Sequence, residues 1–300
     1  MPMTHVIIVP GEDPISIEDA RERLAKRGDR EPYTPELFEA MIGTRQERDY
    51  ISTTSLTTKC MRQNSIQRLY PYAEEMSKMW ASFRGTMFHG QLEKNVTPGA
   101  IEEPRFHVDL DIDGEKLHLS GSPDLVDPNV GILYDYKFTK EAPRFGPWKE
   151  HVAQCNINRW LCDHAEYMEW RGERWTPDEK DPRYFRRDAN KKDKVLVRPM
   201  DWQGLTIVYM DDKGVTPYLA TKSIQVPKAS GEGTKAARVA DVWDDQTVED
   251  IIYGKYPEAH DALTLGNIPP APEGWEYQSH VLCQYCPVRR TCAELERGGC

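Results

Sequence analysis

A carboxylate and an ammonium group stand two residues apart in the segment Ile132-Leu133-Tyr134-Asp135-Tyr136-Lys137-Phe138. Its apolar and aromatic residues indicate a β-strand. Side chains alternate along a strand, so Asp135 and Lys137 would share one face, roughly 7 Å apart. Upstream, the turn Gly121-Ser122-Pro123-Asp124 ends in a second carboxylate. Two carboxylates and a lysine beside a hydrophobic sheet can hold a hard divalent cation and a nucleophilic water.

A histidine on a predicted helix supplies a further metal ligand. Gly85, His89 and Glu93 follow one another at intervals of four residues. On a helix, which we expect over residues 74–95, they would line one face. Glu93 lies one turn beyond His89, where a supporting role near the site and a place in solvent are both open.

A second helix is predicted over residues 147–170, after the Asp135 strand. Its inward stripe begins with two amides and is formed by Gln154, Asn158, Leu161, Ala165 and Met168. Buried amides cost free energy unless they have partners. This indicates that the Gln154 end of the helix meets a site.

The chain has seven cysteines, and three of them, Cys283, Cys286 and Cys292, form a C-x2-C-x5-C pattern. Cys60 lies far upstream, near the beginning of a helix predicted over residues 58–70. The odd number of cysteines and the absence of a signal-peptide pattern favour reduced thiols, so metal or cluster ligation is the expected role of the triplet. Zinc is one alternative, although only one C-x2-C pair is present. The Cys286-Pro287 step is typical of iron-sulfur ligand runs.

These motifs resemble the PD-(D/E)xK nuclease superfamily, and within it the RecB-type branch. Pro123-Asp124 matches the first half of the motif, and Asp135-Tyr136-Lys137 matches the second. Gly85-x-x-x-His89 resembles the histidine element of that branch. Gln154 matches the first position of its Gln-x-x-x-Tyr element, in which Asn158 replaces the tyrosine.

The cysteine arrangement extends the resemblance, which covers about residues 50 to 292. One distant cysteine followed by a close triplet resembles the iron-sulfur nucleases of this branch. These include AddB-type nuclease domains and the CRISPR-associated exonucleases that help to acquire spacers. Short stand-alone versions are common in phages, and this compact chain is similar to them.

The resemblance implies an α/β fold with a restriction-endonuclease-like core, in which helices flank a mixed central sheet and an iron-sulfur clasp closes the chain. It implies that Mg²⁺ or Mn²⁺ is bound by His89, Asp124 and Asp135. It implies a catalytic set made up of Asp124, Asp135, Lys137 and Gln154, in which Lys137 orients the attacking water. It also implies that a [4Fe-4S] cluster is held by Cys60, Cys283, Cys286 and Cys292.

The expected activity is that of a metal-dependent DNA exonuclease, acting at DNA ends or on single strands in recombination, repair or spacer capture. Recombination or CRISPR-adaptation proteins are the expected protein partners. A catalytically weak DNA-end-binding protein of the same fold is the alternative. A zinc-stapled RNA-processing protein is a third hypothesis.

The net charge of −10 is unusual for a nucleic-acid enzyme, because phosphate contacts require Lys or Arg. Positive charge is in local excess between Arg171 and Arg198, where the sequence has ten basic and six acidic residues. This segment is the candidate phosphate-contacting surface, with a solvated loop as the alternative.

The length of 300 residues is sufficient for a large buried core. We expect a helical extension at 1–50, the nuclease core at 51–268, and a cysteine segment at 269–300 that packs with Cys60. No run approaches the ~20 apolar residues that span a bilayer, so we expect a cytoplasmic protein without membrane association. A hairpin is predicted over 106–119, with its turn at Asp113-Gly114.

Overall fold

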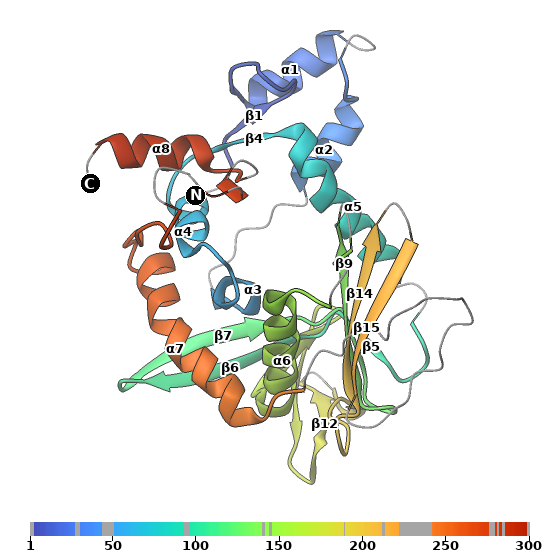
Figure 1. The fold of residues 1–300 in the computed structure, drawn as a ribbon. Coiled ribbons are helices and arrows are strands. Elements are labelled where there is room, and N and C mark those ends of the chain that lie inside the picture. Colours follow the sequence, from blue (N-terminus) through green and yellow to red (C-terminus); the bar gives the residue numbers. More distant parts are fainter. Residues whose placement is uncertain are drawn as a thin grey trace, which may run out of the picture. The chain divides into compact units, whose positions relative to one another are not determined.

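A computed structural model describes residues 3–27, 31–43, 51–92, 96–139, 142–143, 146–188, 190–211, 214–221, 242–275, 280, 282–283 and 286–298. The chain divides into two compact units (Figure 1). The first comprises Met1–Asp49, Thr58–Met87 and Glu258–Cys300, and the second comprises Tyr50–Thr57 and Phe88–Pro257. The expected segments 1–50, 51–268 and 269–300 are not the same as these units and stay a prediction.

In the first unit, the described residues form a small sheet in the order β2-β1-β4, from Ile15–Ser16, His5–Ile7 and Ala73–Glu75. Its helices are α1 (Ile17–Arg27), α2 (Pro35–Gly43), α4 (Met61–Leu69) and α8 (Arg289–Gly298). The α2 start follows from sequence, because the Leu37 N–H donates to Thr34 Oγ1 at 3.2 Å and Pro35 needs no partner. The core of this unit includes Val6, Leu24, Phe38, Ile66 and Met76.

The described part of the second unit contains two sheets. The larger has seven strands in the order β13-β12-β11-β10-β6-β7-β3. Their bounds are Asn190–Leu196, Asp181–Arg187, Glu173–Asp178, Tyr167–Trp170, Arg105–Ile112, Glu115–Gly121 and Ile51–Ser52. The β6–β7 hairpin confirms the prediction, since Asp113 and Gly114 form its turn with φ of 55° and 84°, the left-handed values that such turns require.

The smaller sheet has five described strands in the order β15-β14-β9-β8-β5, with bounds Gly214–Thr221, Gly204–Asp211, Ile132–Phe138, Leu125–Asp127 and Ile101–Glu102. β9 runs parallel to β14 and antiparallel to β8, so the sheet is mixed as predicted. The sequence predicts one central sheet, whereas the described part of the unit has two. The strands β10–β13 account for the difference, because they extend the β6–β7 hairpin and not the sheet that carries Asp135.

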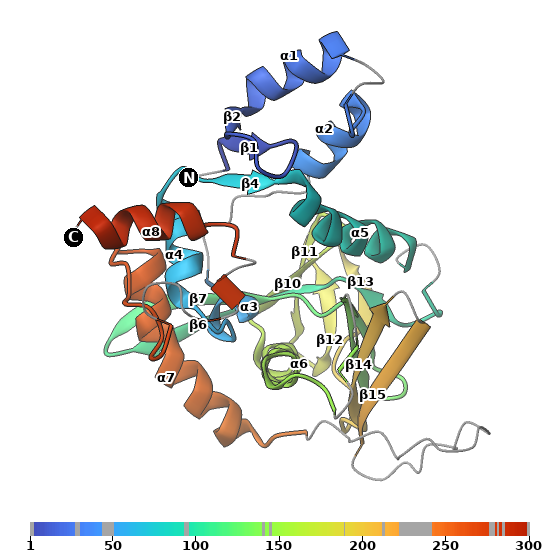
Figure 2. The same cartoon turned by 45° about the horizontal axis from the view of Figure 1, so that its top comes forward.

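Helix α6 (Lys149–His164) packs against β6 and β7 of one sheet and against β9 and β14 of the other, and Figure 2 shows it nearly end-on. The short helix α3 (Thr53–Leu56) packs beside it. The predicted helix over 147–170 was too long at its C-terminal end. Tyr167–Trp170 instead pairs with β6 as β10, which places Met168 in a strand.

Two further helices, α5 (Met76–Leu92) and α7 (Asp245–Leu263), each contain a boundary between the units. The bounds of α5 agree closely with the helix predicted over 74–95. Glu93 and Cys300 lie outside the described residues.

Gly121 sits where β7 meets α6. A Cβ atom added there would lie 2.5 Å from Asn158 Oδ1 and 2.6 Å from Leu161 Cδ1. Asn158 and Leu161 are fully buried, so neither side chain has space to move away. Gly121→Ala is therefore expected to lower the free energy of unfolding by about 1–3 kcal/mol in chemical denaturation. Gly254→Ala is the control, because its Cβ would meet no atom within 4 Å; alanine in helix α7 should leave stability unchanged or raise it. Equal effects of the two variants would contradict the packing argument.

Candidate functional site

Asp124 is fixed at the point where β8 begins. The register pairs Leu125 with Tyr134, so continued pairing would bring Tyr136 opposite Pro123. The Asp124 side chain takes over that position, because its Oδ2 accepts the Tyr136 backbone N–H. A carboxylate that extends the β-ladder in this way has little freedom to turn.

Asp135 and Lys137 lie on the same face of β9, where α6 covers the strand. Lys137 Nζ donates to Asp135 Oδ1 at 2.9 Å and to Gln154 Oε1 at 3.0 Å. Gln154 in turn donates from Nε2 to Thr54 Oγ1 at 3.3 Å. The lysine is thus held between the strand that carries it and the helix that packs over it.

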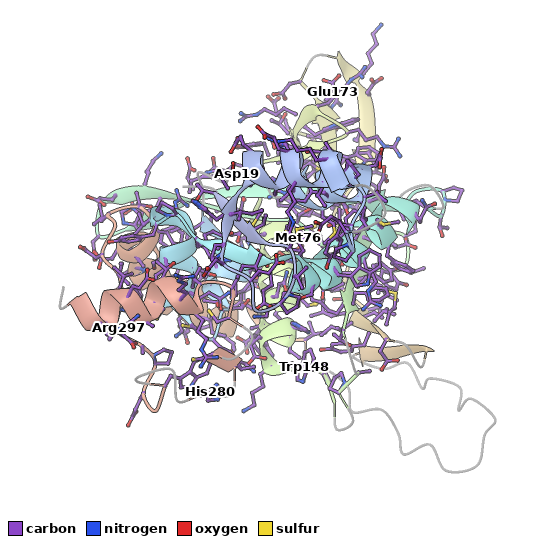
Figure 3. The ribbon with its side chains drawn as sticks, turned by 90° about the horizontal axis from the view of Figure 1, so that it is seen from above. Asp19, Met76, Trp148, Glu173, His280 and Arg297 are labelled. Atoms are coloured by element: carbon purple, nitrogen blue, oxygen red, sulfur yellow. The ribbon has the colours of Figure 1, made fainter. Side chains whose placement is uncertain are left out.

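The position of Gln154 depends on how α6 begins. The hydroxyl of Tyr209, a fully buried residue of β14, accepts the Trp148 N–H at 3.1 Å and lies 2.8 Å from His151 Nδ1. The indole of Trp148, labelled in Figure 3, meets the Tyr209 ring edge-on at 5.4 Å. These contacts tie the first turn of α6 to the strand next to β9.

His89, near the end of α5, lies between two carboxylates. Its Nδ1 is 3.1 Å from Asp124 Oδ1 and 3.4 Å from Glu103 Oε1. Hydrogen bonds to Asp124 and Glu103 raise the pKa of His89 to about 10, although burial opposes the shift. Without a bound cation, this histidine is an imidazolium.

The other half of the site is an ion pair held away from water. Asp135 is 2 % exposed. Burial raises the pKa of Asp135 to about 6, and Lys137 opposes that shift. Burial would lower the pKa of Lys137, but the charges of Asp135 and Asp124 outweigh it and the pKa is raised. Lys137 therefore stays positively charged at neutral pH.

The donor set fits a hard divalent cation. Among the described residues, one oxygen or nitrogen atom from each of His89, Glu103 and Asp124 lies within 4.8 Å of the others. Asp135 falls outside that group. Its buried Oδ2 lies 2.9 Å from Lys137 Nζ, but the angles there do not make a hydrogen bond. This oxygen therefore accepts no hydrogen bond from the described residues. Carboxylates with one imidazole suit Mg²⁺ or Mn²⁺.

Comparison with known families agrees with this chemistry. The profile of the PD-(D/E)XK nuclease superfamily matches residues 29–293. The chain belongs to the PD-(D/E)XK nuclease superfamily. A solved structure titled "Crystal structure of SSO0001" is similar at 16 % identity and a TM-score of 0.46, over 91 % of this chain and 96 % of that one. No curated protein matches the sequence.

Membership of the superfamily implies a metal-dependent nuclease with DNA as its substrate, and PD-(D/E)XK nucleases use divalent metals such as Mg²⁺ and Mn²⁺. The mixed sheet with its flanking helices is consistent with a restriction-endonuclease-like fold. In the described part of the chain, no helix has the length and apolar character needed to cross a membrane.

Within this nuclease, the structure brings together all the residues that the sequence proposed for the site: His89, Asp124, Asp135, Lys137 and Gln154. Sequence reasoning missed Glu103, Thr54 and Tyr209. No motif marks any of the three, since each reaches the site through strand pairing or helix packing. Asn158 is fully buried, and neither of its amide atoms is hydrogen-bonded among the described residues.

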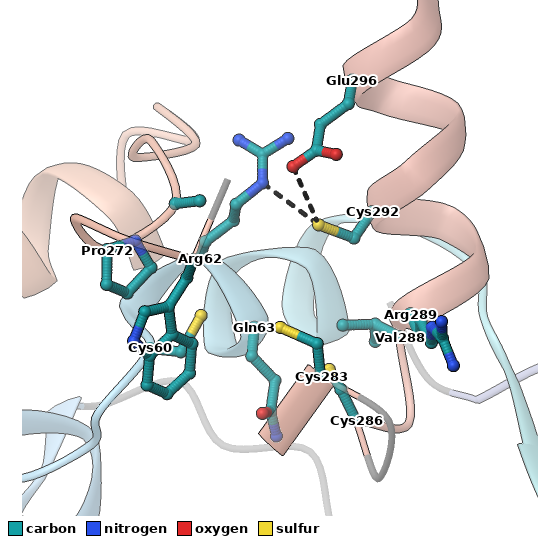
Figure 4. A pocket seen from close by; sticks show the side chains of 12 residues that line it. Cys60, Arg62, Gln63, Pro272, Cys283, Cys286, Val288, Arg289, Cys292 and Glu296 are labelled. Atoms are coloured by element: carbon teal, nitrogen blue, oxygen red, sulfur yellow. Dashed lines mark hydrogen bonds between the residues drawn. The ribbon is translucent and has the colours of Figure 1, made fainter. Parts of the chain in front are cut away.

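The four cysteines of the spacing pattern also come together, within the first unit. One pocket there is lined by Cys60, Cys283, Cys286 and Cys292 (Figure 4). Cys60 precedes α4, and Cys292 lies on α8. Arg62 Nε donates to Cys292 Sγ at 3.3 Å. Burial raises the pKa of the Cys60 and Cys283 thiols, and raises that of Cys286 to about 11.

The basic segment 171–198 is not a solvated loop, because most of it forms β11, β12 and β13. Its charges are largely paired with acids. Asp178 lies 2.6 Å from Lys194 and 3.0 Å from Arg186, and Asp181 lies 2.8 Å from Arg183. Further pairs engage Arg171, Arg174 and Arg187. The segment therefore offers phosphates less free positive charge than its composition suggests.

The His89 environment predicts a pH dependence of stability in chelator-treated protein. The folded-state pKa of about 10 lies above the ordinary 6.5, so the histidine contributes fully below pH 6.5 and loses its contribution as the pH rises through about 10. His89→Gln should cost about 1–2 kcal/mol near pH 6.5, after allowance for solvent screening, and progressively less toward pH 10. The free energy of unfolding of the wild type and of the variant, measured between pH 6.5 and pH 10, tests this dependence. A cost that grows with pH would contradict the assignment.

Proposed function

We propose that this chain is a metal-dependent DNA exonuclease of the RecB-type branch. The observation that carries the proposal is the placement of Lys137, which is bonded to Asp135 and Gln154 beside the His89–Asp124 pair. A charged lysine next to a buried carboxylate, one oxygen of which accepts no hydrogen bond from the described residues, is suited to phosphodiester hydrolysis, in which negative charge develops on the phosphate.

His89, Asp124 and Asp135 would hold Mg²⁺ or Mn²⁺. When bound, the ion would lower the pKa of a water molecule and polarise the scissile phosphate. Lys137 orients that water and offsets developing negative charge, because its pKa is raised and it keeps its proton. Gln154 acts through Lys137: its Oε1 accepts from the ammonium, and its Nε2 is fixed by Thr54. His89 must lose its proton to become a ligand, so ion binding should strengthen as the pH rises.

Action at DNA ends, and a role in recombination, repair or spacer capture, are proposed from the resemblance to RecB-type nucleases. The histidine element ending at His89 and the amide Gln154 carry that resemblance. The phage-like compactness of the chain belongs to the same proposal.

We further propose that Cys60, Cys283, Cys286 and Cys292 hold a [4Fe-4S] cluster. The four side chains line one pocket, and burial there disfavours free thiolates unless a cationic group compensates their charge. A tetrahedral zinc with bonds of about 2.3 Å would bring four sulfurs to about 3.8 Å from one another. Among the described cysteines, no three sulfurs come within 4.8 Å of each other. The four sulfurs are therefore not arranged as a preformed tetrahedral zinc site.

The four ligands all belong to the first unit. A cluster would therefore fasten α4 to the C-terminal segment of that unit, and its contribution would be to folding and not to the hydrolytic chemistry.

An assay with linear and covalently closed circular DNA of the same sequence tests the activity. With Mn²⁺, the linear form should be degraded from its ends, while the circle should persist until it is nicked. Asp135→Asn and Lys137→Met should each reduce the rate by about 10²–10³-fold or more, because each removes charge that acts on the transition state. Progressive shortening of end-labelled strands gives the measurement.

The matched controls are Asp111→Asn and Lys116→Met. This carboxylate and lysine are cross-strand neighbours in the β6–β7 hairpin, so their loss should leave the rate within about twofold. Cleavage of closed circles at the linear rate would show an endonuclease. Full activity of the Asp135 or Lys137 variant, purified free of host nuclease, would refute the site.

The cluster proposal predicts that anaerobically purified protein is brown and contains about four iron and four sulfide per chain. Cys60→Ala should lose the colour and aggregate, because the first unit loses a ligand that fastens α4 to its C-terminal segment. Cys300→Ala, outside the spacing pattern, is the control and should keep both colour and solubility. Metal analysis and absorption spectra provide the readout. Stoichiometric zinc without iron would favour a zinc site and leave the nuclease proposal intact.

A further inference from the structure

Glu103 is held at the site by an unusual backbone conformation. It lies in the turn between β5 and β6, with a φ of 44°, which residues other than glycine rarely adopt. Its backbone N–H donates to the Asp124 carbonyl oxygen at 3.0 Å. This bond ties the turn to the residue immediately before β8, so Glu103 and Asp124 are held close together.

The Glu103 carboxylate lies close to two of the proposed metal ligands, His89 and Asp124. Atoms of Glu103, His89 and Asp124 lie within 4.8 Å of one another. Ligands of one octahedral ion with bonds of about 2.1 Å lie about 3–4 Å apart. The three side chains are therefore close enough to share one ion without a change of fold.

A second observation points to a cation at this place. Asp135 is 2 % exposed, and its Oδ2 accepts no hydrogen bond from any residue that the structure describes, although Lys137 Nζ lies 2.9 Å away outside bonding geometry. Its electrostatic environment includes both Asp124 and His89, so the carboxylate belongs to the same cluster of charges. A buried carboxylate oxygen without a donor is costly, and a metal ion would satisfy it.

We propose that Glu103 is a fourth protein ligand of the divalent ion, in addition to His89, Asp124 and Asp135. The inference rests on the metal site of the proposed function and assigns it one more carboxylate. Three carboxylates and a neutral imidazole carry a charge that exceeds the charge of one divalent ion. The free protein therefore loads its ion before DNA arrives, because affinity for hard cations rises with the number of charged oxygen ligands.

The test is a titration of the complete chain with Mn²⁺ in the absence of DNA. The electron paramagnetic resonance signal of the free ion reports how much Mn²⁺ is bound. Glu103→Gln keeps the size and polarity of the side chain and removes its charge. The Mn²⁺ dissociation constant should rise at least ~10-fold, since one charged oxygen ligand is lost. Glu115→Gln is the control, because this exposed glutamate stands at the far turn of the β6–β7 hairpin and should leave the constant unchanged.

A second measurement separates ligation from support of His89. Water proton relaxation at saturating Mn²⁺ reports the water molecules bound directly to the ion. If Glu103 is a ligand, Glu103→Asn opens one position to water and relaxivity per bound ion rises, because the shorter side chain does not reach the ion. If Glu103 only orients His89, affinity falls while hydration stays the same, and this outcome overturns ligation. Glu103→Asn provides a second variant, because asparagine tolerates the left-handed backbone and its side chain is too short to replace the carboxylate.

Unchanged affinity and hydration in both variants, with circular dichroism confirming the fold, would also overturn the inference. These readouts do not involve cleavage, so they separate it from the proposed activity. Wild-type protein that binds no Mn²⁺ would refute the metal site as a whole. Tight Mn²⁺ binding through Glu103 in a chain that cuts no DNA would refute the nuclease proposal alone.

Discussion

The site depends on one carboxylate that is engaged at both oxygens. Asp124 Oδ2 takes the Tyr136 N–H that a longer β8 would have paired, and Oδ1 lies 3.1 Å from His89 Nδ1. Because the first contact fixes Asp124 to the backbone of β9, the second fixes His89 relative to the same strand. Tyr136 stands between Asp135 and Lys137, so this contact places Asp124 and His89 beside both of those side chains.

The charges of the site do not balance within the protein. Glu103, Asp124 and Asp135 carry three negative charges when ionised, and the imidazolium of His89 and the ammonium of Lys137 carry two positive charges, which leaves −1. The charged form of Asp135 is disfavoured, since burial raises the pKa of its carboxyl group to about 6. Taking charged groups out of water is costly unless they are paired and hydrogen-bonded. A divalent cation would relieve this imbalance by displacing the His89 proton and by binding Asp135 Oδ2, which accepts no hydrogen bond from the described residues.

Sequence periodicity identified the elements that carry the chemistry, because their signals are local. The apolar run around Asp135 predicted β9, four-residue spacing predicted the helix of His89, and Asp113-Gly114 predicted the β6–β7 turn. Glu103, Thr54 and Tyr209 could not be found in this way, since strand register or helix packing brings each of them to the site. The end of α6 was misplaced for a related reason: pairing with β6 overrides helical periodicity at Tyr167. Periodicity reports which way a side chain faces, and not which distant residue it meets.

The same limit affects the question of how a chain of charge −10 approaches a polyanion. Composition pointed to the segment 171–198, but most of its arginines, and Lys194, are paired with Asp178, Asp181 and other acids. Arg198 donates to the Cys162 and Ala165 carbonyl oxygens and therefore supports structure. Because these cations are already paired and the site itself carries a net charge of −1, the strands β11–β13 attract phosphates only weakly. A bound divalent ion, with the His89 proton displaced, would change the charge of the site from −1 to 0. Loading of the ion would then govern the approach of the scissile phosphate as well as its hydrolysis, because the phosphate can enter at low electrostatic cost only after the carboxylates are neutralised.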